Sequence, residues 1–315
     1  LVMAAAAGRQ ARKITEKWRR ALSSTADEIE RLDGLLRTQS HPDTKNLLPR
    51  LNRAGVEIAD LLGEIDSLKP REIIAKKASL NDRMETAVAA GNALANTTAA
   101  LLFAQDNRPF IVRAAPTITN DRILPTSLLS HGSAPRELAL AACPEEYESV
   151  SFVVIPSRDI ENLTVNSSDL ESADGVIGAA EIDIKLVKCW FQGGGGWTPG
   201  GVQTVKGKVL MPELLVNDDD LVRVDLEKKQ NLLRVADPDT GRVRYEDVTV
   251  EANDGLTSEL IVRDAPALLP VDISASEVRQ FWLTVRVPAD AATGTYRGML
   301  TVRSAGSTAL DLPLR

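Results

Sequence analysis

The sequence predicts a multidomain α+β protein, in which an N-terminal antiparallel three-helix bundle precedes an antiparallel β-sandwich of Ig-like or jelly-roll-like type. The chain has 315 residues, which is room for about two domains that each bury a core. Before residue 105 apolar residues recur every three or four positions, and after residue 108 they alternate with polar ones. We therefore place the helical domain at 1–107 and the β-sandwich domain at 108–315.

Three apolar stripes predict the helices. Side chains spaced alternately by three and four residues share one face of a helix, as in coiled coils. The stripes are Trp18, Leu22, Thr25, Ile29, Leu32 and Leu36; Leu51, Ala54, Ile58, Leu61, Ile65 and Leu68; and Ile73, Leu80, Ala87, Leu94 and Leu101. The turn-forming segment "SHPDT" (40–44) and Pro70 separate them, which predicts helices over about 8–38, 47–69 and 71–104.

Alternating segments rich in Val, Ile, Thr and aromatic residues predict the strands. They cover 136–143, 147–155, 181–190, 220–226, 242–250, 280–287 and 295–302. The segment "DPDTG" (237–241) has the residues of a hairpin loop, with Pro238 presetting φ and Gly241 able to adopt positive φ. Many strands without intervening helices are typical of an antiparallel sandwich.

The segment "FWLTVRVPADAATGTYRGMLTV" (281–302) predicts a second hairpin, in which Pro288 ends the first strand. Gly294 is expected to support a tight or positive-φ turn. Tyr296 is expected to bury its ring while its hydroxyl binds a backbone group. Gly298 is expected to permit close approach of a neighbouring chain segment. These are structural roles.

The composition and the lengths of the apolar runs indicate which classes of partner we do not expect. With 44 acidic and 37 basic residues the net charge is −7, whereas a nucleic-acid binder shows a basic patch or stripe. We therefore expect no nucleic acid, and we interpret the basic run 12–20 as a solvated helix face. No apolar run approaches the roughly 20 residues that span a bilayer, so we expect no membrane span.

The first eight residues, "LVMAAAAG", are similar to the end of a secretory signal peptide, whose cleavage site prefers small residues. This interpretation predicts a secreted, periplasmic or cell-surface protein. The alternative is the start of a helix in a longer chain.

No motif for catalysis, cofactor or metal binding occurs. The sequence lacks a Gly-Lys-Ser/Thr phosphate loop, a Gly-x-Ser-x-Gly elbow and a His-Glu-x-x-His helix. Two His and two Cys lie too far apart for zinc spacing, and "NDDD" (217–220) lacks the spacing of an EF-hand loop, so we interpret it as a turn into a strand. Glu145 and Glu146 are adjacent, whereas glycosidic carboxyls face each other across a cleft, so we interpret them as solvated turn charges. We expect no catalytic residue, no cofactor and no metal.

Two features remain open. Cys143 and Cys189 lie on predicted strands and either form a disulfide or stay buried thiols. The segment "WFQGGGGWTPGG" (190–201) contains four consecutive glycines, which resist a fixed loop conformation. We expect it to project from the sandwich as a loop, with Trp190, Phe191 and Trp197 contacting glycan or a neighbouring domain. The alternative places Trp190 in the core.

Four segments together resemble the sandwich that precedes the catalytic barrel in bacterial glycoside hydrolases of the family 123 group and related secreted proteins. They are 137–154, 187–192, 209–225 and 281–302. The resemblance covers 109–315 and implies a non-catalytic accessory region, with the catalytic residues in a C-terminal domain beyond Arg315. The family pattern has Gly-Glu before Tyr147, where this chain has Glu145-Glu146.

Two alternatives stay beside this interpretation. The first is a structural or cell-surface assembly protein whose helical stripes form a homo-oligomer, which solution mass would reveal. The second is a carbohydrate-binding module that acts alone and depends on Trp197, which a glycan array would reveal.

Overall fold

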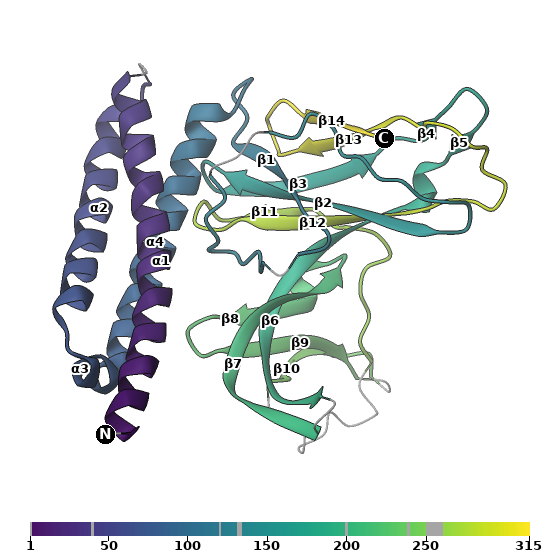
Figure 1. The fold of residues 1–315 in the computed structure, drawn as a ribbon. Helices are drawn as coiled ribbons and strands as arrows, with labels where there is room; N and C mark the ends of the chain where they lie inside the picture. Colours follow the sequence, from purple (N-terminus) through teal and green to yellow (C-terminus); the bar gives the residue numbers. More distant parts are fainter. Residues whose placement is uncertain are drawn as a thin grey trace.

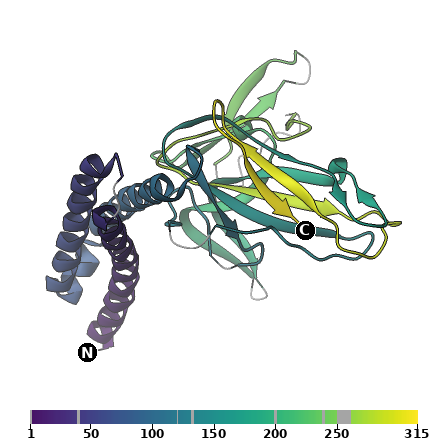
Figure 2. The same cartoon turned by 90° about the horizontal axis from the view of Figure 1, so that it is seen from above.

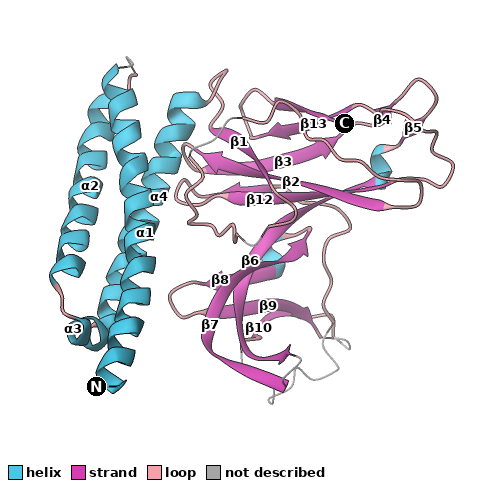
Figure 3. Cartoon of the chain, viewed as in Figure 1, coloured by secondary structure: helices cyan, strands magenta, loops and turns pink. Residues whose placement is uncertain are grey.

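The computed structural model describes residues 2–38, 41–119, 121–130, 134–198, 201–237, 240–249 and 261–315. Helices occupy the first third of the chain and antiparallel sheets the rest (Figures 1 and 3). The predicted α+β class is therefore confirmed. None of the described helices combines the length and apolar character that crossing a bilayer requires.

The helices are α1 (Val2–Thr38), α2 (Thr44–Ser67), α3 (Pro70–Ala75) and α4 (Lys77–Phe103). They lie close to the predicted ranges, except that the first begins at Val2 and not near residue 8, and that the third is interrupted at Lys76. The N–H of Lys69 donates to the carboxylate of Glu72 over 2.7 Å and caps the first turn of α3, which Pro70 begins. The helices α1, α2 and α4 contact one another, and most of the predicted stripe residues are buried.

The strands are β1 (Phe110–Ala115), β2 (Tyr147–Pro156), β3 (Ile160–Ser167), β4 (Leu170–Glu171), β5 (Val176–Ile177), β6 (Ile182–Thr198), β7 (Gly201–Val216), β8 (Val222–Asp225), β9 (Gln230–Ala236), β10 (Val243–Asp247), β11 (Val271–Ile273), β12 (Arg279–Arg286), β13 (Gly298–Arg303) and β14 (Leu310–Leu314). A five-stranded sheet has the order β1-β2-β12-β6-β7, and a four-stranded sheet has the order β11-β3-β13-β14. A three-stranded sheet, β10-β9-β8, and the pair β4-β5 complete the described strands.

The five-stranded and four-stranded sheets share one hydrophobic core. Alternation along β12 directs Phe281, Leu283 and Val285 into this core, where each is at most 1% exposed. Leu163 of β3 and Leu300 of β13 enter it from the four-stranded sheet. The predicted hairpin between β9 and β10 is confirmed, and Gly241 adopts a φ of +67° there; Pro238 lies outside the described residues.

A second core joins the helices to the five-stranded sheet. Ile111, Val153 and Ile155 are at most 6% exposed and belong to the same buried cluster as the helical stripes. In Figure 2, α4 is the helix that reaches the sheets, and it contacts β1 and β2. The hydroxyl of Thr97 on α4 also donates to the carbonyl of Ala275 over 2.9 Å. The domain boundary at 107/108 stays a prediction, and apolar contacts run across it.

The predicted hairpin at 281–302 is wrong. Strand β12 pairs with β2 and β6 in the five-stranded sheet, whereas β13 pairs with β3 and β14 in the four-stranded sheet. The connection 287–297 is longer than the loops of about two to five residues that close hairpins, so it crosses from one sheet to the other. Alternation predicted both strands but could not predict their partners.

Three of the four structural roles expected in this segment are confirmed. Strand β12 ends at Arg286, shortly before Pro288, and Tyr296 packs half-buried against the core between the sheets. The hydroxyl of Tyr296 donates to the carbonyl of Ala292 over 3.0 Å. A Cβ on Gly298 would lie 2.5 Å from the carbonyl oxygen of Asp169, so only glycine fits there. For Gly294 the positive-φ alternative is wrong, because its φ is not positive, and nothing would meet a Cβ there within 4 Å.

Two further expectations about strands are corrected. Segment 136–143 forms no regular strand; only Leu138 is bridged, in parallel, to Leu314. The glycine-rich segment was expected to project as a loop, but Gly194–Gly196 belong to β6 and pair with β7. Glycine has no side chain that could pack, so the backbone pairing between β6 and β7 determines the conformation of these glycines.

The turn before β2 carries strain that glycine would relieve. The N–H of Glu146 donates to the carbonyl of Cys143 over 3.2 Å, with Pro144 and Glu145 between them. Glu145 has a φ of +67°, and a type II turn requires positive φ at this position.

We therefore expect Glu145→Gly to raise the free energy of unfolding by about 1 kcal/mol, because a non-glycine residue pays a steric cost in the left-handed region. Urea denaturation measures the change. Glu145→Ala is the matched control and should give no gain, since it retains Cβ. Equal stabilisation by both variants would contradict the assignment of strain to Glu145.

Candidate functional site

A groove lies on the side of the five-stranded sheet opposite the inter-sheet core. It has a volume of about 540 Å³. The residues that line it come from the segment after β1, from β6 and β7, and from β12: Pro116, Thr117, Thr119, Asp121, Arg122, Ile123, Val187, Met211, Pro212, Glu213, Leu215, Gln280 and Trp282.

Trp282 forms the aromatic part of this lining. Its neighbours Phe281 and Leu283 point into the core, so strand alternation directs Trp282 to the opposite face. The backbone is fixed on both sides, because Trp282 pairs with Ser151 of β2 and Lys185 of β6. The ring is half-buried, and its N–H donates to no side chain or backbone group among the described residues.

Gln280 and Glu213 supply polar groups next to Trp282. The amide nitrogen of Gln280 donates to the hydroxyl of Ser151 over 2.7 Å, which orients the amide. The carboxylate of Glu213 accepts from the indole N–H of Trp190 over 2.9 Å and from the side-chain amide of Gln192. Trp190 therefore affects the groove indirectly, because its indole N–H orients the carboxylate of Glu213.

The segment after β1 lines another side of the groove and is tied to its surroundings downstream. The side-chain amide of Asn96 on α4 donates to the carbonyl of Ser127, and its oxygen accepts from the N–H of Leu129, over 2.8 and 2.9 Å. The N–H of Val278 donates to the carbonyl of Pro125 over 2.9 Å. These bonds attach the segment both to the helices and to the start of β12.

The residues predicted to contact glycan or a neighbouring domain separate in the structure. Trp190 is half-buried beside the groove. Phe191 is 9% exposed, and its backbone N–H and carbonyl both bind the side chain of Asn231, over 2.8 and 2.7 Å. Trp197 lies in β6, but its side chain is outside the described residues.

No motif in the sequence pointed to Trp282, Gln280 or Glu213 as site residues. The sequence did contain a signal for Trp282, because its position in an alternating strand directs its side chain to the face opposite the core. A large aromatic side chain on the solvent side of a sheet is unusual without a partner. Glu213 gave no such signal, because its proximity to Trp190 depends on the pairing of β6 with β7.

The acidic segment 217–220 forms the turn into β8 that the sequence predicted, with a short helical turn over Asp219–Leu221. Its three carboxylates face three different cations. The pairs are Asp218–Arg234 (2.7 Å), Asp219–Lys188 (2.6 Å) and Asp220–Arg223 (2.7 Å). Among the described residues, no group of three or more His, Cys, Asp or Glu side chains gathers as a metal site.

Cys143 and Cys189 are both free thiols in the structure, the first exposed and the second half-buried. The thiol of Cys189 donates over 3.6 Å to the carbonyl of Ile123, which lines the groove. Burial raises the pKa of Cys189 to about 11.

We expect an aromatic disulfide reagent at pH 8 to modify Cys143 rapidly and Cys189 only on unfolding. A thiol with a pKa of about 11 is ionised in roughly one molecule in a thousand at that pH. Release of the chromophore measures the reaction, and Cys143→Ser should abolish the fast phase. A native protein in which neither thiol reacts until a reductant is added would show instead that the two are joined.

Comparison with known proteins shows weak structural likeness and no match in sequence. No family model matches the sequence, and no curated protein matches it. Among solved structures, one that is similar belongs to a family 123 glycoside hydrolase from Clostridium perfringens, described for glycolipid glycan hydrolysis, with 14% sequence identity and a TM-score of 0.32. The match covers 57% of this chain and 22% of that chain, so this chain spans about a fifth of that protein's length. Membership of the family stays a prediction.

Proposed function

We propose that this chain is a non-catalytic accessory region of a secreted carbohydrate-active protein, and that it contacts glycan through the Trp282 groove. In this proposal an antiparallel three-helix bundle and an Ig-like or jelly-roll-like sandwich form its scaffold, and the region positions a C-terminal catalytic domain.

The observation that carries the proposal is the placement of Trp282 beside oriented polar groups. Sugar rings present C–H groups on their faces and hydroxyls around their edges. An aromatic ring covers the apolar face, while the amide of Gln280 and the carboxylate of Glu213 are positioned to bind hydroxyls. Binding sites generally combine an apolar surface with a few fixed polar groups in this manner.

The exposure of the carboxylates favours binding over hydrolysis. Asp121 and Glu213 both line the groove and are both exposed to water. In glycoside hydrolysis the general acid is held in a desolvated environment that keeps it protonated. An exposed carboxylate bound to Trp190 serves better as an acceptor for hydroxyls.

The assembly alternative would require a surface other than the helical stripes. Most stripe residues, including Trp18, Leu32 and Leu51, are at most 2% exposed because α1, α2 and α4 bury them against one another. Apolar side chains already buried within one chain are not available to a second.

We expect Trp282→Ala to weaken binding of the oligosaccharides that the wild-type protein selects on a glycan array by about tenfold or more, since a central Trp is typically worth 2 kcal/mol or more at an interface. Calorimetric titration measures the loss. Tyr147→Ala removes an aromatic that is 67% exposed on β2 and does not line the groove, and it should leave affinity unchanged. Wild-type affinity in Trp282→Ala would contradict the site, and turnover of a chromogenic hexosaminide would contradict the non-catalytic assignment.

A further inference from the structure

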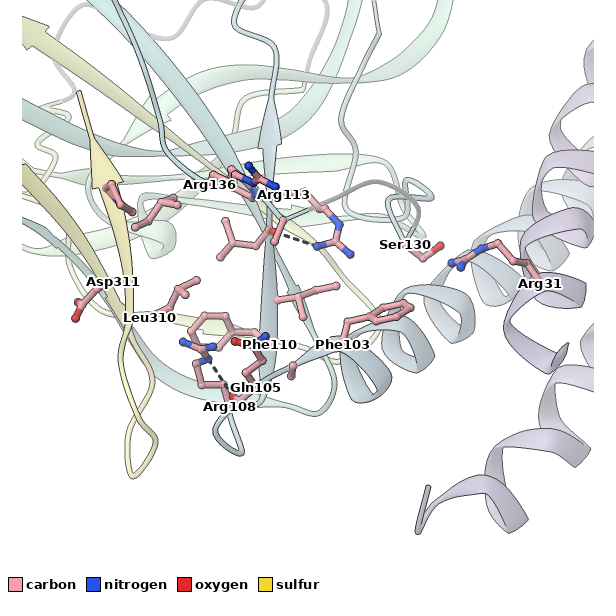
Figure 4. A pocket seen from close by; sticks show the side chains of 17 residues that line it. Arg31, Phe103, Gln105, Arg108, Phe110, Arg113, Ser130, Arg136, Leu310 and Asp311 are labelled. Atoms are coloured by element: carbon pink, nitrogen blue, oxygen red, sulfur yellow. Dashed lines mark hydrogen bonds between the residues drawn. The ribbon is translucent and has the colours of Figure 1, made fainter. Parts of the chain in front are cut away.

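A second cavity, of about 700 Å³, lies where the helices meet the sheets (Figure 4). Its lining comes from α1, the end of α4, the segment that leads into β1, β1 itself, residues near 130 and 134–136, and β14. It shares no lining residue with the Trp282 groove. Four of its lining residues are arginines, namely Arg31, Arg108, Arg113 and Arg136.

Arg113 is the unusual member of this set. It is 8% exposed and sits on the helix-facing side of β1, the side of Ile111 and Ala115. Its described hydrogen bond is a single 3.2 Å contact from Nη1 to the carbonyl of Val112, and its buried Nε has no partner among the described residues. No described carboxylate forms an ion pair with it.

A buried guanidinium without a counter-ion is costly, because desolvation of the charge is not offset. Burial, and secondarily the positive charge of Arg31, lowers the pKa of Arg113. A fold that retains such a group next to an open cavity can offset the cost by binding an anion there.

The lining of the cavity carries more positive than negative charge. Arg31 forms two hydrogen bonds to the carboxylate of Glu28 over 2.7 and 2.6 Å. Arg108 lies 3.5 Å from the carboxylate of Asp106. Among the described lining residues Asp311 is the one carboxylate, and it accepts from the hydroxyl of Thr301 over 2.7 Å.

Ser130 supplies a second unsatisfied polar group. Its side chain is 1% exposed, lines the cavity, and its Oγ has no partner among the described residues. In Figure 4 the side chain of Arg31 extends from α1 toward Ser130, and Arg113 lies on the other side of Ser130. Buried polar groups are almost always hydrogen-bonded, so two orphaned donors lining one cavity indicate a missing acceptor.

Most of the remaining lining is apolar, apart from Gln105 and Asp311. Phe103 is 40% exposed at the end of α4, and Phe110 lies with it at the lower side of the cavity in Figure 4. Leu310, Leu312 and Pro313 of β14 complete this surface. An occupant must therefore combine an anionic group with an apolar body.

We propose that this cavity binds a small organic anion, whose carboxylate or phosphate accepts hydrogen bonds from Arg113 and Ser130 while its apolar body rests on Phe103 and Phe110. The planar guanidinium suits two parallel bonds to either oxyanion. Arg136 is exposed at the cavity and adds long-range attraction. The site is independent of glycan binding at the Trp282 groove.

The test titrates the full 315-residue chain calorimetrically with four probes. Phenylphosphate and phenylacetate carry both features, inorganic phosphate carries the charge alone, and benzyl alcohol carries the ring alone. We expect each of the first two to bind about tenfold or more tightly than either single-feature probe.

The variants locate the binding. Arg113→Met should lower the affinity for phenylphosphate and phenylacetate by about tenfold or more without lowering the melting temperature of the free protein, since it replaces an unpaired buried charge by an apolar side chain. A purely structural role for Arg113 predicts the opposite, a lower melting temperature. Arg136→Ala changes an exposed residue and should weaken binding by a few fold. Arg71→Met, at an exposed position on α3, and Trp282→Ala should leave the affinity unchanged.

Two results would overturn the proposal. One is that neither two-feature probe binds more tightly than about 10 mM. The other is that both bind with wild-type affinity to Arg113→Met and Arg136→Ala. If Arg113→Met fails to fold, Arg136→Ala still tests the proposal, because Arg136 is exposed and its replacement removes no buried packing.

Discussion

Phe281→Ala is expected to lower the free energy of unfolding by about 4 kcal/mol, the middle of the range for removing a buried aromatic ring. Phe281 is 0% exposed at the centre of the five-stranded sheet and pairs directly with Phe152 of β2. The two rings stack with centroids 5.3 Å apart and an interplanar angle of 14°. Deleting one ring leaves a cavity between the sheets and removes the stacking partner of the other.

Urea denaturation followed by circular dichroism measures the loss. Phe281→Leu should cost less than Phe281→Ala, because most of the volume is kept. Tyr147→Ala, at the edge of the same pair of strands and 67% exposed, should change the stability by less than about 0.5 kcal/mol. A loss below about 1 kcal/mol in Phe281→Ala would show that the ring is not enclosed as described.

Ile155→Ala is expected to cost about 3 kcal/mol and to destabilise the helices together with the sheets. Ile155 is 0% exposed on β2 and belongs to the buried cluster that the helices α1, α2 and α4 contribute to. Because α4 contacts both β1 and β2, the two parts of the chain lose apolar contact area together.

Two spectroscopic probes of the same denaturation show whether the helices and the sheets unfold together or independently. Far-ultraviolet circular dichroism reports mainly the helices, and near-ultraviolet circular dichroism reports the packed aromatic residues. We expect both midpoints to fall together, whereas Val176→Ala on β5, where Val176 is 60% exposed, should move neither. A helical transition that keeps its wild-type midpoint in Ile155→Ala would show that the helices fold independently of the sheets.

The sequence predicted those elements whose identity depends on local pattern. The stripe through Trp18, Leu22 and Ile29 predicted α1 because helical spacing alone determines which side chains share a face. The roles of Tyr296 and Gly298 were predictable because each follows from the side chain present or absent at one position.

Local patterns could not predict which strands pair or which distant segments come into contact. Alternation predicts β12 and β13 as strands, yet sheet order is decided by contacts between segments far apart in sequence, such as β12 with β2. The same limit hid both cavities. Trp282 and Glu213 line one groove because β6, β7 and β12 are neighbours, and Arg113 lies on the side of β1 that packs against the helices.

The most direct test of glycan binding follows the indole N–H signals of the four tryptophans, Trp18, Trp190, Trp197 and Trp282, by nuclear magnetic resonance during titration with an oligosaccharide that the protein binds. Trp282 lines the groove and Trp190 holds Glu213, so we predict that their signals shift together with one dissociation constant. The signal of Trp18 should stay in place, because that ring is 1% exposed among the helices and donates to Asn81. Saturable glycan binding that leaves the Trp282 signal unmoved would contradict the account.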